Sequence, residues 1–155
     1  MSLEQDLQAE IVGHLDLSLY LTVEGGTQVK DVLKRMREQR RNCVLVTNGG
    51  RLLGIFTERD VLRKVVNHPE TWDSPLVTVM TAMPHTVRSD DLVAQAIDLM
   101  NSGHFRNMPV VDREGKVTGN LTQYAIIQFL CDHFPQEVYN LPPDPDQTAN
   151  ARDGA

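Results

Sequence analysis

An internal repeat is the sequence feature that most constrains the fold of this 155-residue chain. Thr22-Val23 recurs as Thr86-Val87, at an offset of 64 residues. One extra residue near Gly103 raises the offset to 65, so that Arg41-Asn42 aligns with Arg106-Asn107. Self-similarity at a fixed period indicates a supersecondary unit that is used more than once. The chain is therefore predicted to contain two units of the same local structure.

Both copies show the same order of local patterns. Apolar residues at i, i+3, i+4 and i+7 predict an amphipathic helix, and two short apolar strands joined by a polar turn predict a hairpin after it. A second helical stripe begins just after Thr57 and Thr122. With an initial strand, each unit is predicted as strand, helix, strand, strand, helix. The stripes are Val29, Val32, Leu33, Met36 and Val93, Ala96, Ile97, Met100 for the first helix, and Val61, Leu62, Val65, Val66 and Ile126, Ile127, Leu130, Cys131 for the second.

Neither copy is long enough to bury its helix faces and both faces of its sheet alone. We therefore expect an α/β module in which two tandem βαββα repeats pack about a pseudo-twofold axis. The predicted division is an N-terminal helical lead-in over 1–14, the first repeat over 15–67, a linker over 68–76, the second repeat over 77–133 and a C-terminal tail over 134–155. The tail contains prolines and few apolar residues, so it is expected not to order itself.

Composition narrows the class of protein. No apolar run approaches the ~20 residues that span a bilayer, and the first residues lack the pattern of a secretory signal, so a cytoplasmic protein without a membrane partner is expected. The net charge of -6 disfavours nucleic-acid binding, and the basic stretch at 34–41 has no interleaved aromatic residues. The two cysteines and five histidines show no spacing typical of a metal site or a nucleophile. We expect neither catalysis, nor a metal, nor a required cofactor.

Two segments of the repeat carry a more specific signal: residues 54–60, with the sequence GIFTERD, and residues 79–87, with the sequence VMTAMPHTV. Together with the paired repeat over residues 15–133, they resemble the cystathionine beta-synthase (CBS) domain, two copies of which form a Bateman module. The resemblance implies a regulatory, non-catalytic module that commonly binds AMP, ADP, ATP or S-adenosylmethionine in clefts between the repeats. It also favours a homodimer, and signalling to a separate protein that the sequence does not identify.

The first candidate cleft is centred on Asp60. Its carboxylate can accept from both hydroxyls of a ribose, while the hydroxyl of Thr57 suits a phosphate. The same pair also satisfies a capping box, and the two roles can coexist. Arg106 is suited to a phosphate, with His104 assisting when protonated, although both side chains also suit a solvated loop. The set that the resemblance implies is Thr57, Asp60, Thr81, His85, His104, Arg106, Asn107, Met108 and Pro109, of which Met108 and Pro109 are alternatively core residues.

The second copy departs from the pattern at one position. Ala125 takes the place of Asp60, and alanine can neither bond a ribose nor complete a capping box. We therefore expect the second cleft to be the weaker one; its residues are Arg41, Asn42, Cys43, Val44 and Thr122. The competing function is a protein-interaction or dimerisation adaptor that binds no nucleotide, docking through the module or through the proline-rich segment at 141–145.

Overall fold

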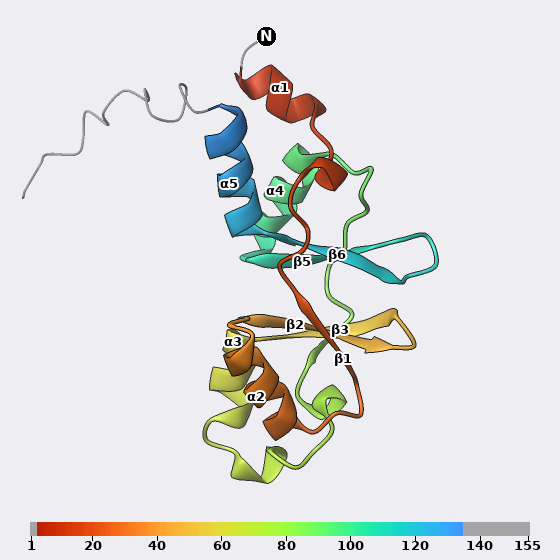
Figure 1. The fold of residues 1–155 in the computed structure, drawn as a ribbon, viewed down its shortest axis with the longest axis vertical. Helices are drawn as coiled ribbons and strands as arrows, with labels where there is room; N and C mark the ends of the chain where they lie inside the picture. The colour runs from red at the N-terminus through yellow and green to blue at the C-terminus, as the bar shows by residue number, and fades with distance from the viewer. Residues whose placement is uncertain (1–2, 135–155) are drawn as a thin grey trace, which may run out of the picture.

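The computed structural model describes residues 3–134, so the predicted tail lies outside the described residues apart from Phe134. The two repeats are stacked, with their sheets facing each other and their helices on the outer sides (Figure 1). The first repeat contributes β1 (Leu21–Glu24), α2 (Val29–Glu38), β2 (Cys43–Asn48), β3 (Arg51–Thr57) and α3 (Glu58–Asp60). The second contributes α4 (Val93–Gly103), β5 (Asn107–Val111), β6 (Val117–Thr122) and α5 (Gln123–His133), while α1 (Leu3–Ala9) precedes both repeats and β4 (Thr81–Ala82) lies between them. The predicted α/β architecture is confirmed.

The sheet of the first repeat has the order β1-β2-β3-β4. β1 is parallel to β2, β2 and β3 form the predicted hairpin, and β4 is antiparallel to β3. The turn of the hairpin is made by Gly49 and Gly50, both with positive φ, which glycine adopts without steric cost. In the second repeat β5 and β6 form the matching hairpin, but the predicted initial strand is reduced to one parallel bridge between Val87 and Val110.

Alternation along β2 divides the apolar residues between two environments. Val44 and Val46 pack into the core of the first repeat, between the sheet and α2. Cys43 and Leu45 point the other way and, with Ile55 of β3, form a smaller apolar cluster. Val117 of β6 packs against that cluster, which joins the two sheets. The repeats therefore share buried surface, as their small size required.

Each repeat is completed by a segment that precedes the other one. Val12 and Leu15 lie in the core of the second repeat, and Leu76 and Val79 lie in the core of the first. Backbone hydrogen bonds fix both segments: the amide of Val93 donates to the carbonyl of Glu10, and the amide of Val29 to that of Ser74. The lead-in and the linker thus act as parts of the opposite repeats.

The second helices of the two repeats differ. α5 is a regular helix, whereas α3 ends at Asp60 and continues as a π-helix over Val61–Val65. The prediction of a fully inward stripe was wrong in part, because Leu62 is 70% exposed and Ile127 is 58% exposed. A π-turn contains an extra residue, so it rotates later side chains relative to the core. In α5 the inward positions are instead Ala125 and Phe129.

Candidate functional site

A cavity of about 620 Å³ lies between the repeats. Its walls come from the two loops that lead into β2 and β5 and from the first residues of α3 and α5, so both repeats contribute to it. Pockets of about 300–1,000 Å³ are typical of small-molecule sites. The lining residues are Leu19, Arg40, Arg41, Asn42, Glu58, Arg106, Asn107, Thr122, Gln123 and Tyr124.

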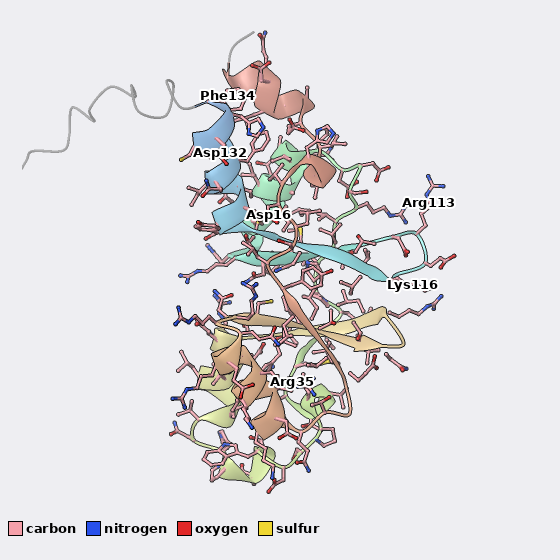
Figure 2. The ribbon with its side chains drawn as sticks, in the orientation of Figure 1. Asp16, Arg35, Arg113, Lys116, Asp132 and Phe134 are labelled. Atoms are coloured by element: carbon pink, nitrogen blue, oxygen red, sulfur yellow. The ribbon has the colours of Figure 1, made fainter. Side chains whose placement is uncertain are left out.

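The charge of this cavity is opposite in sign to that of the chain. Three arginines line it, and Glu58 is the acidic residue of its wall. Within residues 3–134, no carboxylate lies within ion-pair distance, 4.0 Å, of any of these guanidinium groups. Arg113 and Lys116 do not line this cavity: they lie at the β5–β6 turn, across the module from α5 (Figure 2). Asp16 interacts with Arg41 at longer range, and Glu58 is in the wall, so the cavity keeps an excess of positive charge, which suits an anionic ligand.

Among the described residues, two buried polar atoms have no hydrogen-bond partner: Arg41 Nε, a donor on a residue that lines the cavity, and Asn120 Oδ1, an acceptor on a residue that does not line it. Asn120 is 0% exposed, and its Nδ2 donates to the carbonyl of Leu19 and to Asn107 Oδ1, both at 3.2 Å. Leu19 and Asn107 line the cavity, so the amide of Asn120 lies directly behind its wall. Most buried polar atoms in proteins are paired, so such exceptions call for an explanation. A ligand that brings its own donor and acceptor would supply one.

Thr122 places the start of α5 at the cavity. It has an extended backbone, and its side-chain oxygen accepts from the amide of Ala125 at 2.9 Å. This is an N-cap, which satisfies one of the free amides at the beginning of a helix. Thr122, Gln123 and Tyr124 all line the cavity, so the positive end of the helix dipole adds to the charge of the arginines.

Asp60 occupies a different environment. It is 5% exposed, and its carboxylate closes the capping box with Thr57, whose amide donates to Oδ2 at 3.0 Å. Oδ1 accepts from Thr81 and forms an ion pair with Lys64, both at 2.9 Å. The structural role as a cap is confirmed, and the predicted proximity of Thr81 is present. Asp60 lines neither the large cavity nor the smaller one that adjoins it, and its role as a ribose acceptor stays a prediction.

The remaining predicted residues separate into three groups. Arg106 and Asn107 of the first set, and Arg41, Asn42 and Thr122 of the second, line the large cavity. His104 lines a smaller cavity of about 240 Å³, and His85 is exposed with its ring 5.1 Å from that of Phe105. Met108, Pro109, Cys43 and Val44 are buried, as the alternative core interpretation of the first two had it. The large cavity therefore combines residues of both predicted sets.

Five lining residues were not identified from sequence: Leu19, Arg40, Glu58, Gln123 and Tyr124. Three of them, Arg40, Glu58 and Gln123, adjoin predicted residues, so widening each predicted segment by one position would have found them. Arg40 carries a further signal, because it has φ 51° and its counterpart in the repeat, His104, has φ 55°. The matched left-handed positions turn the chain sharply from α2 and α4 into the loops that line the cavity.

Burial raises the pKa of the Cys43 thiol to about 12, with a further contribution from the negative charge of Asp60. The thiol is therefore neutral and unreactive at physiological pH. Among residues 3–134, no three histidine, cysteine or acidic side chains gather in a group that could hold a metal ion. No helix in the same range is long and apolar enough to cross a membrane.

Comparison with known families gives a match to the CBS domain at residues 18–67 and again at 76–132. These segments are the two stacked repeats of Figure 1 and include most of the residues that line the cavity. The chain belongs to the CBS domain family. Its relatives include the CBS domain-containing protein CBSCBSPB2 of Arabidopsis thaliana, 40% identical over 103 residues, which are 65% of this chain and 19% of that protein. The chain thus spans about a fifth of the length of the curated relatives that it matches first.

Solved CBS domain structures share the fold. The crystal structure of CBSX2 in complex with AMP has a TM-score of 0.70 and 26% identity, covering 79% of this chain and 96% of that one. The cytosolic domain of the Mg²⁺ channel MgtE in complex with ATP has a TM-score of 0.61 and 26% identity, covering 72% of this chain and 45% of that one. Tandem CBS repeats with this arrangement therefore form complexes with adenine nucleotides in other proteins.

Proposed function

We propose that this CBS pair is a regulatory module that binds an adenosine-containing metabolite in the large cavity between its repeats. The observation that carries the proposal is a cavity lined by three arginines without an ion-pair partner among residues 3–134, one of which, Arg41, has a buried Nε without a hydrogen-bond partner. A nucleotide combines an anionic part with a base that offers both donors and acceptors. Its phosphate oxygens would match the charge and supply an acceptor for Arg41.

The residues suggest a division of labour inside the cavity. Arg41 and Arg106 come from matched loops of the two repeats, and a guanidinium pairs well with phosphate oxygens. Asn107 and the ring of Tyr124 offer hydrogen bonds and apolar contact to a nucleoside. The AMP complex of CBSX2 and the ATP complex of MgtE support adenine nucleotides as the ligand class. The candidates are AMP, ADP, ATP and S-adenosylmethionine, and the proposed role requires neither catalysis nor a cofactor.

The test is thermal unfolding and calorimetric titration of the full chain with the four candidate ligands. A ligand that binds only the folded state raises the unfolding temperature, and the rise grows with the logarithm of the ligand concentration above the Kd. Arg41→Gln should weaken binding about tenfold or more, since charge-assisted hydrogen bonds are worth about 1.5–3 kcal/mol. Arg35→Gln is the matched control, because Arg35 is an exposed arginine of α2 that lines neither cavity. Absence of any response to all four ligands would refute the proposal and favour the adaptor function.

A regulatory module must pass on whether its ligand is bound, and we propose that a homodimer is the first step of that signal. Leu62 and Ile127 occupy matched positions of the two repeats and are both largely exposed, and Tyr124 is 63% exposed although it lines the cavity. A twofold pair of chains would cover such faces with a self-complementary contact. Tyr124 would then link the ligand to the contact and to an unidentified protein target. Sedimentation should show a dimer at micromolar concentration that Leu62→Glu dissociates, and a monomeric unmodified chain would contradict the dimer.

A further inference from the structure

The smaller cavity adjoins the larger one. Arg106 and Gln123 line both, so these two side chains form a shared wall. The other residues of the smaller cavity are Arg59, Met100, Asn101 and His104. A molecule held in the large cavity by Arg106 therefore has a second hollow of about 240 Å³ next to that contact.

We propose that the smaller cavity is a subsite for the terminal phosphates of a nucleoside di- or triphosphate. The proposal rests on the proposed function, in which the nucleoside and first phosphate occupy the large cavity. It predicts that the chain binds ATP and ADP more tightly than AMP. It also predicts that the chain discriminates against S-adenosylmethionine, which has a sulfonium cation in place of the phosphates.

The chemistry of the lining supports an anion. Its polar side chains are two guanidinium groups, an imidazole and two amides, and no carboxylate is among them. Arg59, like Arg106, has no ion-pair partner among residues 3–134. The two guanidinium groups offer hydrogen-bond donors only, and phosphate oxygens are acceptors only. Gln123 Nε2 already donates to the carbonyl of Phe105, so the two arginines carry the argument.

The negative end of the α4 helix dipole opposes the charge of the two arginines, and it is the smaller charge. Met100 and Asn101 belong to the last turn of α4, where the helix dipole places about half a negative charge. The amides of His104 and Phe105 both donate to the carbonyl of Met100, which offsets part of that charge. Two full guanidinium charges outweigh the remainder, so the subsite keeps a positive potential.

Arg59 gives the sharpest test, because it lines the smaller cavity and not the larger one. In calorimetric titrations of the full chain at one low salt concentration without divalent cations, ATP should bind about tenfold more tightly than AMP. That ratio corresponds to one added charge-assisted contact. Arg59→Gln should abolish the advantage of ATP while changing AMP affinity less than about twofold. Arg63→Gln, an exposed arginine one turn further along that lines neither cavity, should leave both affinities unchanged.

The outcomes separate the subsite from the proposed function. Equal affinity for ATP and AMP, equal weakening of both by Arg59→Gln, or tight binding of S-adenosylmethionine would overturn the subsite and leave adenosine binding intact. Inorganic tripolyphosphate serves as the probe without a nucleoside. Binding of tripolyphosphate that requires Arg59, with no response to any adenosine compound, would uphold the subsite and refute the proposed function. Failure of ATP and tripolyphosphate to bind would overturn the subsite, and failure of AMP, ADP and S-adenosylmethionine as well would overturn the proposed function.

Discussion

The two repeats use different chemistry at the same structural position. In the first repeat Asp60, Lys64 and Thr81 form a polar network that joins the start of α3 to β4. The matching residues of the second repeat are Ala125, Phe129 and Leu17, all apolar. Phe129 and Leu17 belong to the apolar core of that repeat and its margin. A network of charge and hydrogen bonds in one copy is thus replaced by side-chain packing in the other.

This difference changes the meaning of Ala125. Judged from sequence, the missing carboxylate made the second cleft the weaker candidate, because a ribose acceptor was absent. In the structure, that junction carries no fixed negative charge, whereas the carboxylate of Asp60 is saturated by its own repeat. A phosphate entering beside Thr122 therefore meets three arginines and the start of α5, with Glu58 as the acidic residue of the wall. Three cations against one carboxylate make this the better place for an anion.

The largest effect on stability should come from truncating Phe129, the apolar counterpart of Lys64 in the second repeat. Phe129→Ala should lower the free energy of unfolding by about 3–5 kcal/mol, since it leaves a cavity in the core of the second repeat. Lys64→Met in the first repeat should cost only about 1–2 kcal/mol, because Asp60 keeps its donors from Thr57 and Thr81 and the ammonium is partly exposed. Urea denaturation checks both, with the exposed Gln128→Ala as a control expected to lie within about 0.5 kcal/mol of the unmodified chain. Equal losses for Phe129→Ala and Lys64→Met would contradict the contrast.

A smaller loss of stability should come from substituting Gly54 and Gly119, against which the segments around Thr81 and Leu17 pack. A Cβ added to Gly54 would lie 2.6 Å from the carbonyl oxygen of Thr81, and one added to Gly119 would lie 2.7 Å from Leu17 Cβ. Each substitution to alanine should cost about 1–3 kcal/mol, because the added Cβ forces the strand away from the segment that packs on it. Gly54→Ala should cost more, since its closest contacts include backbone. Gly26→Ala, which meets nothing within 4 Å, is the control, and thermal unfolding that ranks it with the others would contradict the close approach.

The mildest test is chemical labelling of the cysteines, which reports on the contact between the repeats. Cys43 lies in the cluster that joins the two sheets, and burial raises its pKa to about 12, whereas Cys131 is partly exposed. At pH 8 an alkylating reagent should therefore modify Cys131 in the folded chain and reach Cys43 only when the repeats open or unfold. Mass spectrometry of peptides after timed labelling measures this. Rapid labelling of Cys43 in the folded chain would show that the repeats separate readily.

The sequence predicted what depends on local pattern. The stripes of α2 and α4, the glycine-containing turn at 48–50 and the strands around it follow from spacings of a few residues, and all are confirmed. The exchange of the segments around Val12 and Leu76 was not predicted, because it depends on contacts far apart in the sequence, such as Val12 with Asp91 and Leu76 with Thr27, that no local period encodes. The π-helix also escaped prediction, since its side chains show an ordinary helical stripe.

The candidate site was likewise predicted only in part. The resemblance identified the matched loops around Arg41 and Arg106 and the start of α5 at Thr122, all of which line the cavity. That one cavity draws on loops of both repeats could not be predicted, because it depends on how the repeats pack. The ion pair of Lys64 with Asp60 was also missed, since a lysine four residues along a helix is too common a pattern to signal it. The arginine arrangement around Arg59 and Arg106 likewise arises only when the repeats are stacked.

The central claim is that the ligand occupies the large cavity rather than the surroundings of Asp60. Calorimetric titration of Arg41→Gln and Asp60→Asn with ATP tests it most directly, once circular dichroism has shown that both variants are folded. We expect Arg41→Gln to weaken binding about ten- to hundredfold, and Asp60→Asn to leave the affinity within about threefold of the unmodified chain. A large loss in Asp60→Asn with unchanged affinity in Arg41→Gln would contradict the claim and place the ribose on Asp60.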